Sequence, residues 1–131
     1  MMKNLQKILF RLQKLHPREI DLSLDRIKNI CKKLENPEKN LKVISVVGTN
    51  GKNSTIQAMR SILNEAKIKA NIYTSPHIQK INERFVFNNN EISDDELCKL
   101  LSEVETINKG DEITYFEILT AAFLKKANEN K

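Results

Sequence analysis

The sequence predicts an α/β protein, and three observations along the chain support that fold class. A β-branched run, V-I-S-V-V, occupies residues 43–47 and ends at a glycine. Apolar residues at helical spacing follow over 56–66, and a second strand-like run, A-N-I-Y-T, follows over 70–74. Strand, helix and strand in this order form a βαβ unit. We therefore expect a mostly parallel sheet that begins within residues 42–75.

Length and composition fit one domain. The 131 residues are 40% hydrophobic, which supports one modest core. Charged residues make up 30% of the chain, and no apolar run approaches the roughly 20 residues that cross a bilayer. The apolar stretch at 8–10 is too short for a secretion signal. We expect a cytoplasmic protein with no membrane partner.

The charge pattern and the cysteines argue against two further classes. The net charge of +5 favours anionic partners, but the basic residues are scattered and no aromatic residues alternate with them to stack on bases. We expect no nucleic-acid partner. Cys31 and Cys98 form no C-x-x-C pair, so we expect buried, reduced thiols rather than a metal site.

Helical spacing predicts the remaining elements. Residues 1–41 contain two apolar stripes, the first ending before Pro17 and the second beginning after Ser23, which we expect to be its N-cap. Residues 93–131 contain two more, each opening on a capping-box pattern, S-D-D-E and T-Y-F-E. Residues 76–92 lack helical spacing and predict a loop with a short strand or hairpin arm.

The strongest chemical signal is G-T-N-G-K-N-S at 48–54, between the predicted strand and helix. Glycines let successive N–H groups point at one anion, and the helix that follows contributes its positive dipole end. Lys52 adds a charge that can reach the β- and γ-phosphates of a nucleotide. The pattern is shorter than G-x-x-x-x-G-K-[ST], and the competing interpretation is an ordinary βα turn. No strand-like run ends in a carboxylate that would hold a metal ion.

Four more motifs accompany this loop: I-D-L-S-L-D-R at 20–26, Y-T-S-P-H at 73–77, E-R-F at 83–85 and T-Y-F-E at 114–117. Together they resemble the folylpolyglutamate synthase/dihydrofolate synthase family, a branch of the Mur ligase superfamily. The resemblance implies the N-terminal part of a P-loop, Mur-ligase-like ATPase domain, incomplete in this chain, with the C-terminal glutamate-binding domain absent.

The resemblance also implies an activity in folate biosynthesis and one-carbon metabolism. The family members are ATP-dependent amide ligases that add L-glutamate to dihydropteroate or folates through an acyl phosphate, with ATP and Mg²⁺ as cofactors. It leaves open whether the product is dihydrofolate, tetrahydrofolylpolyglutamate or both. We expect the full-length enzyme to be a monomer and this chain alone to be inactive. The alternatives are a truncated ATP-binding or regulatory module without catalysis, and a fragment of a peptidoglycan Mur ligase.

Site residues follow from the resemblance by position. ATP would be bound by Gly48, Thr49, Asn50, Gly51, Lys52, Asn53 and Ser54, with Lys52 catalytic; Mg²⁺ by Ser75; and the pterin by Ile20, Asp21, Leu22, Ser23, Thr114, Tyr115, Phe116 and Glu117. Each role has a simpler competitor, because Ser75 precedes a proline, Ser23 and Glu117 are adequate helix caps, and Phe116 could belong to the core. Asn53 and Ser23 replace family glycines.

Overall fold

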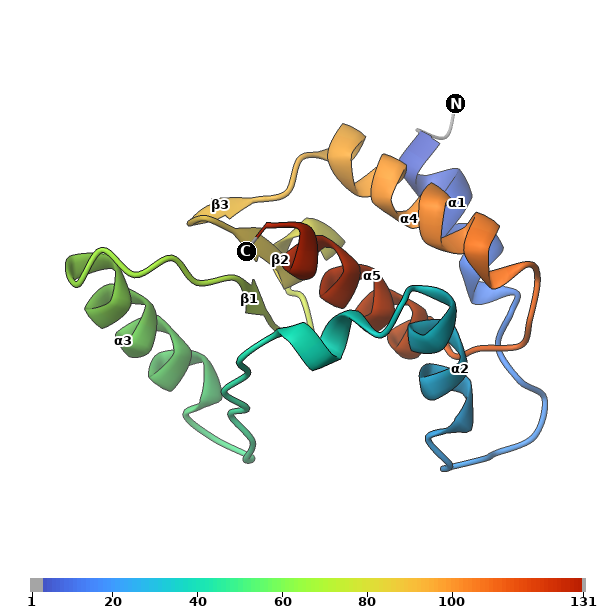
Figure 1. The fold of residues 1–131 in the computed structure, drawn as a ribbon, viewed down its shortest axis with the longest axis horizontal. Helices are drawn as coiled ribbons and strands as arrows, with labels where there is room; N and C mark the ends of the chain where they lie inside the picture. Colours follow the sequence, from blue (N-terminus) through green and yellow to red (C-terminus); the bar gives the residue numbers. More distant parts are fainter. Residues whose placement is uncertain (1–3, 131) are drawn as a thin grey trace. The chain divides into compact units, whose positions relative to one another are not determined.

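The computed structural model describes residues 4–130, which form two compact units (Figure 1). The helical unit comprises 4–41 and 93–130, and the loop unit comprises 42–92. Predictions that concern residues 1–3 and 131 lie outside the described residues. Within 4–130, no helix has both the length and the apolar character needed to span a membrane.

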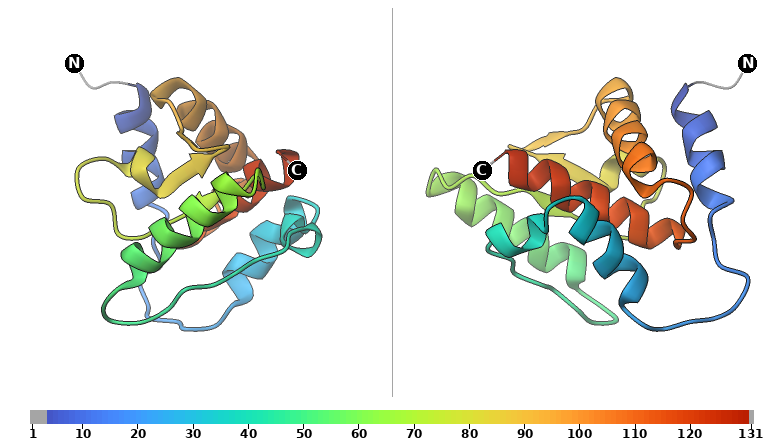
Figure 2. Two further views of the ribbon diagram at one scale, coloured as in Figure 1. Left: turned by 90° about the vertical axis from the view of Figure 1, so that its left-hand side faces the viewer. Right: turned by 45° about the vertical axis from the view of Figure 1, so that its right-hand side comes forward.

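The helical unit contains four α-helices and one 3₁₀ helix: α1 (Asn4–Gln13), α2 (Asp25–Lys33), η1 (Pro37–Asn40), α4 (Asp94–Asn108) and α5 (Tyr115–Glu129). Helix α1 packs beside α4, while α2, η1 and α4 pack on α5 (Figure 2). The predicted apolar stripes form the core. Its fully buried side chains include Leu12, Leu97, Leu101, Val104, Ile118 and Leu119. The four helices predicted for this unit are confirmed.

The N-termini of the helices test the predicted caps. Helix α5 begins with a full capping box, because the Thr114 hydroxyl accepts the Glu117 N–H at 3.1 Å and the Glu117 carboxylate accepts the Thr114 N–H at 3.0 Å. For α2 the predicted cap is wrong. Leu24 is the N-cap and makes no side-chain cap bond, while the Ser23 hydroxyl donates to the Asp21 carboxylate at 3.0 Å and accepts the Asp25 N–H at a long 3.4 Å.

The loop unit contains α3 (Lys52–Glu65), β1 (Ile72–Tyr73), η2 (Ile81–Arg84), β2 (Phe85–Phe87) and β3 (Asn90–Glu91). The strands form one antiparallel sheet in the order β1-β2-β3, with Ile72 opposite Val86 and Phe87 opposite Asn90. Asn88 and Asn89 connect β2 to β3 with positive φ values of 51° and 65°, which suit a tight hairpin turn. The hairpin arm predicted within 76–92 is confirmed.

The predicted strand at 43–47 and the predicted mostly parallel sheet are wrong for the described residues. Residues 43–47 belong to no strand, and Val43, Ile44 and Val47 are 66%, 72% and 88% exposed. A strand persists only where a neighbour satisfies its N–H and C=O groups. Strand β1 pairs with β2 alone, and within 4–130 the run at 43–47 pairs with neither edge of the sheet, so the βαβ unit does not form.

Candidate functional site

The predicted phosphate loop is a tight turn that leads into α3. Gly48 has a φ of 150° and Gly51 a φ of 75°, both in the region that favours glycine. Gly51 is the N-cap of α3 and supplies no side-chain hydrogen bond to the first turn. The N–H groups at this end of the helix are therefore not capped by the N-cap side chain, and that arrangement suits an anion.

The side chains of this loop face solvent. Thr49, Asn50, Lys52, Asn53 and Ser54 are all exposed. A Cβ placed on Gly48 would lie 3.8 Å from the Asn50 carbonyl oxygen and 4.0 Å from Cγ of Lys52. The stem of Lys52 thus lies close to the turn, and the seven predicted nucleotide-binding residues form one contiguous segment of the sequence.

Ser75, the predicted metal ligand, lies two residues beyond the end of β1 in the same unit. It is exposed and precedes Pro76 through a cis peptide bond. Among residues 4–130 no hydrogen bond joins Ser75 to the 48–54 loop, and no group of three His, Cys, Asp or Glu side chains could hold a metal ion. Ser75 therefore offers one hydroxyl and no preformed site.

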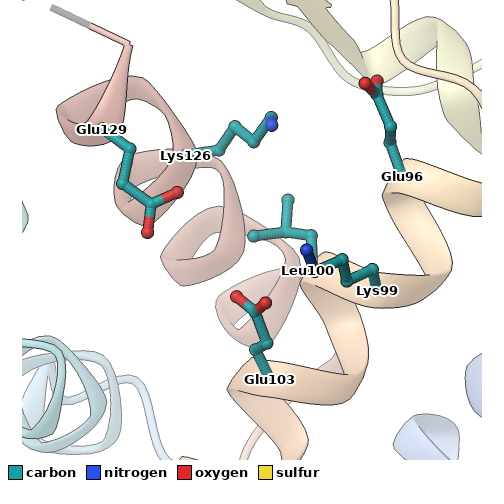
Figure 3. A pocket seen from close by; sticks show the side chains of 6 residues that line it. All are labelled: Glu96, Lys99, Leu100, Glu103, Lys126 and Glu129. Carbon is teal, nitrogen blue, oxygen red and sulfur yellow. The ribbon is translucent and has the colours of Figure 1, made fainter.

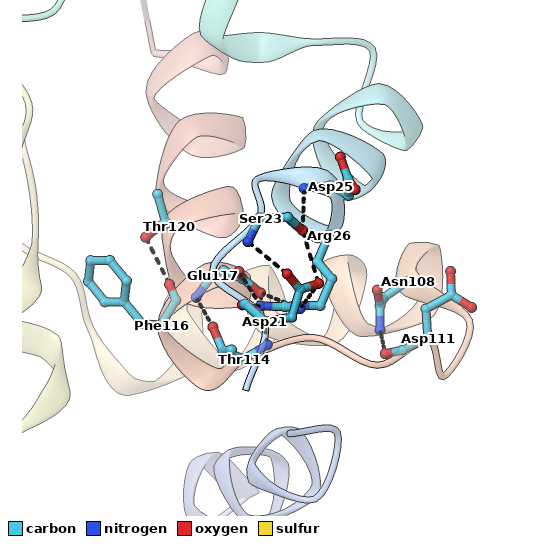
Figure 4. Close-up of polar contacts among 10 residues, drawn as sticks. All are labelled: Asp21, Ser23, Asp25, Arg26, Asn108, Asp111, Thr114, Phe116, Glu117 and Thr120. Carbon is cyan, nitrogen blue, oxygen red and sulfur yellow. Dashed lines mark hydrogen bonds and ion pairs between the residues drawn. The ribbon is translucent and has the colours of Figure 1, made fainter. Parts of the chain in front are cut away.

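The two predicted pterin segments, 20–23 and 114–117, are brought together in the helical unit (Figure 4). Arg26 of α2 joins them. Its Nε and Nη2 donate to the two carboxylate oxygens of Glu117 at 3.0 and 3.2 Å, and its Nη1 donates to the Asp21 carboxylate at 3.0 Å. Nη2 also donates to the Asp21 carbonyl oxygen at 2.8 Å.

These contacts stabilise the charged forms of both carboxyl groups. The pKa of Asp21 is lowered mainly by hydrogen bonds from the N–H and hydroxyl of Ser23, with Arg26 contributing. Burial acts to raise the pKa of Glu117, but hydrogen bonds from Arg26 and Thr114 outweigh it and the pKa is lowered. Both side chains are therefore anionic at neutral pH.

The apolar members of the pterin segments are exposed. Ile20 and Leu22 are 94% and 92% exposed, and Phe116 is 51% exposed. Phe116 is therefore not a core residue, and its ring points away from the ion pairs around Arg26 in Figure 4. Tyr115, the first residue of α5, is half-buried.

The segment 77–84 of the loop unit is held by its own side chains. The Glu83 carboxylate accepts three backbone N–H groups, from Ile78 at 3.1 Å, Gln79 at 2.8 Å and Lys80 at 2.9 Å. These bonds lower the pKa of Glu83. Nε of Arg84 donates to Nδ1 of His77 at 2.9 Å, so His77 is a hydrogen-bonded residue of this loop.

A shallow pocket on the helical unit stands apart from these residues. It is lined by six side chains of α4 and α5, namely Glu96, Lys99, Leu100, Glu103, Lys126 and Glu129 (Figure 3). Charges of both signs line it, and no residue of the predicted sites contributes to it. This pocket adds nothing to the candidate site.

Comparison with known proteins finds similar sequences over most of the chain. The chain is 36% identical over 113 residues to the dihydrofolate synthase/folylpolyglutamate synthase of Haemophilus influenzae and 40% identical over 115 residues to that of Bacillus subtilis. These matches cover 86% and 82% of this chain. Over most of its length the chain is similar in sequence to these synthases. It spans about a quarter of the synthases' length, 26% and 27% respectively, and no family profile matches it.

Solved structures of such synthases have the same fold over nearly the whole chain. The bifunctional synthase from Yersinia pestis, complexed with AMPPNP and Mn ion, superposes with a TM-score of 0.88 at 30% identity, covering 99% of this chain and 32% of that one. A synthase complex with AMPPCP and folate superposes with a TM-score of 0.85 at 27% identity, covering 97% and 33%.

The motif at 20–26 includes Arg26, but the sequence does not predict that this residue joins the two pterin segments. Arg26 and Glu117 are 91 positions apart, so no local pattern announces their ion pair. The one local signal is Asp21 five positions before Arg26, which by itself suggests only a surface pair. Glu83 was placed in the family motif, but its role in holding 78–80 was not predicted.

Proposed function

We propose that this chain carries the nucleotide-phosphate and pterin segments of an ATP-dependent ligase that adds L-glutamate to dihydropteroate, folates or both. The observation that carries the proposal is the open N-terminus of α3, with Gly51 at its cap and Lys52 beside it, in a chain related to synthases of that name. Solved relatives bound to ATP analogues and to Mn ion or folate support the choice of ligands.

The 48–54 loop suits the phosphates of ATP. A phosphate placed at the first turn of α3 would meet backbone N–H groups and the positive end of the helix dipole. Lys52, exposed and close to the Gly48 turn, would add a full positive charge toward the β- and γ-phosphates. Thr49, Asn50, Asn53 and Ser54 would supply the remaining polar contacts.

The reaction we propose has two steps. A carboxylate oxygen of the pterin substrate attacks the γ-phosphorus of ATP, and ADP leaves with the electrons of the broken P–O bond. The amine of glutamate then attacks the carbonyl carbon of the acyl phosphate, and inorganic phosphate leaves as the amide forms. In the first step an anion approaches an anion, so Lys52 and the N–H groups of the loop lower the barrier by neutralising charge.

A divalent cation would assist the same charge neutralisation. Mg²⁺ prefers oxygen ligands and is commonly held by nucleotide phosphates together with a few protein groups. Ser75 would supply one hydroxyl ligand. The described residues contain no acidic cluster that could hold the ion. In this chain we therefore expect the phosphate oxygens of the nucleotide to be its main ligands.

The pterin would lie at the segments 20–23 and 114–117. Exposed Ile20, Leu22 and Phe116 offer apolar surface for a flat heterocycle, and Phe116 offers an aromatic face for stacking. The half-exposed Asp21 carboxylate offers a hydrogen-bond acceptor to the N–H groups of the pterin ring, while Glu117, engaged by Arg26 and Thr114, holds the first turn of α5 in place.

Calorimetric titration of the chain with ATP, with and without Mg²⁺, tests the nucleotide part of the proposal. We expect Lys52→Ala to weaken ATP binding by roughly tenfold or more, equivalent to about 1.4 kcal/mol. Lys69→Ala is the matched control, because Lys69 is an exposed lysine of the same unit outside the loop. Equal affinities of Lys52→Ala and the unmodified chain, with both folded, would refute the role of Lys52.

A further inference from the structure

The ion pairs around Arg26 differ from simple surface pairs in two ways: two of the three side chains are mostly covered, and the arginine bridges two segments. Arg26 and Glu117 have side chains only 16% and 17% exposed, whereas Asp21 is 52% exposed. The guanidinium bridges a loop that precedes α2 and the first turn of α5, two segments far apart in the sequence (Figure 4). It therefore fixes the geometry of one segment relative to the other.

Glu117 performs two roles at once. Its Oε2 accepts the Thr114 N–H in the capping box and also accepts Nε of Arg26, while Oε1 accepts Nη2 of Arg26. The carboxylate is held in one plane by the bidentate fork, so the cap and the ion pair support each other. The start of α5 is ordered by both sets of contacts.

The same guanidinium also holds the loop at 21–25, through its hydrogen bonds to Asp21. The Asp21 carboxylate accepts the Ser23 N–H at 2.8 Å and the Ser23 hydroxyl, and the Ser23 hydroxyl oxygen accepts the Asp25 N–H at 3.4 Å. Nη2 of Arg26 also donates to the Asp21 carbonyl oxygen, and this bond fixes the backbone as well as the side chain. One arginine thus determines the conformation of a loop whose neighbouring residues Ile20 and Leu22 are exposed.

We propose that Arg26 is a positioning residue for the pterin site, holding residues 21–23 against the first turn of α5 so that a ligand meets both segments in a fixed arrangement. This inference rests on the proposed function for the identity of the ligand. An arginine is required because three nitrogens in one plane serve two carboxylates and a carbonyl oxygen; a lysine ammonium cannot reproduce that fork.

The test compares Arg26→Gln and Arg26→Lys with Lys33→Gln in the full 131-residue chain. Lys33 is the matched control because it also lies on α2 and also bridges to another segment, through the Asp111 carboxylate and the Asn108 carbonyl oxygen, without touching the pterin segments. Binding of 7,8-dihydropteroate is measured by calorimetry, and the folded fraction of each variant is measured by urea titration.

We expect both Arg26 variants to weaken dihydropteroate binding by roughly tenfold or more, since small misplacements of binding groups have effects of this size or larger. Lys33→Gln should bind within about twofold of the unmodified chain, although it too loses an ion pair and some stability. Arg26 variants that are folded and bind as tightly as the unmodified chain would overturn the proposal. If Arg26→Gln does not fold, the dihydropteroate affinity of Arg26→Lys alone tests the proposal by the same criterion.

A second readout separates this inference from the proposed function. In ¹H–¹⁵N spectra, the amides of Ser23 and Thr114 should shift and exchange faster in Arg26→Gln, and stay unchanged in Lys33→Gln. If the unmodified chain binds no dihydropteroate, the proposed pterin site is refuted, and these amides then decide whether Arg26 positions the two segments. Unchanged Ser23 and Thr114 amides in Arg26→Gln would refute the positioning role itself.

Discussion

The helices of the helical unit and of the loop unit have similar apolar spacing, but their apolar side chains differ in burial. In the helical unit, Leu101 of α4 and Leu119 of α5 are fully buried. In the loop unit, α3 buries none of its residues and Ile62 is 67% exposed. Apolar periodicity therefore suffices to form a helix, but burial depends on whether a partner surface is present.

The two proposed binding regions differ in the same way. The pterin segments lie on the well-packed unit and are joined by the ion pairs of Arg26 with the partly buried Glu117 and the half-exposed Asp21. The phosphate loop lies at the start of α3, a helix stabilised by few tertiary contacts. Ligand-binding segments are commonly drawn from the less stable parts of a fold. We expect the pterin segments to be preformed and the phosphate loop to gain most of its order from nucleotide.

The largest expected difference comes from removing one apolar side chain in each unit. Leu101→Ala should lower the free energy of unfolding by about 2–5 kcal/mol, because it leaves a cavity in the core. Ile62→Ala should change it by no more than about 0.5 kcal/mol, because Ile62 faces solvent. Urea unfolding followed by circular dichroism measures both, and equal losses would erase the contrast between the units.

The cysteines probe packing within the helical unit. Cys31 is 5% exposed, and burial, together with the nearby Glu38 carboxylate, raises its pKa to about 11. Because the thiolate is the reactive species, Cys31 should react with iodoacetamide at pH 8 at least roughly tenfold more slowly than the half-buried Cys98. Mass spectrometry of Cys31→Ser and Cys98→Ser proteins gives each rate. Matching rates would show that Cys31 is not protected by the core.

The capping box provides a smaller effect. Thr114→Ala should cost about 1 kcal/mol, since it removes the hydroxyl that accepts the Glu117 N–H. Thr106→Ala is the control, because its hydroxyl donates to the Ser102 carbonyl within an exposed part of α4 and its loss should cost no more than about 0.5 kcal/mol. A Thr114 variant as stable as the Thr106 variant would deny the cap any energetic role.

The smallest effect concerns acid and the 77–84 segment. Glu83 has a pKa below its ordinary value of 4.5, so its contribution is complete above that value and is lost as the pH falls through the lowered pKa. Amide exchange at 78–80 should accelerate below about pH 4 and stay unchanged between pH 7 and pH 5, apart from the intrinsic pH dependence. In Glu83→Gln the acid-induced step should disappear; an identical step there would assign it to another group.

The sequence predicted those features that depend on neighbouring residues. Helix positions and the Thr114–Glu117 capping box follow from local spacing and local backbone preferences, and both are present, as is a hairpin within the predicted loop at 76–92. The strand at 43–47 could not be decided locally. A β-branched run becomes a strand only when another strand pairs with it, and that information lies elsewhere in the fold.

The candidate sites divide in the same manner. The glycine turn and Lys52 could be found from the sequence, because a phosphate loop is a contiguous motif. The contact between 20–23 and 114–117 depends on Arg26 and Glu117, which meet only after α2 packs on α5. Each segment could be found from its own sequence motif, but the contact between the two segments is visible only in the tertiary structure.

Native-state hydrogen exchange across the whole chain tests the central contrast most directly. Amides in the middle of α4 and α5 should exchange only through global unfolding, so that their exchange free energy equals the free energy of unfolding measured in urea. Amides in the middle of α3 should exchange roughly 100-fold faster or more, because a helix of 14 residues without buried side chains is only marginally stable. If α3 amides exchange as slowly as those of α4, the loop unit is as firmly folded as the helical unit, and the two units do not differ in stability.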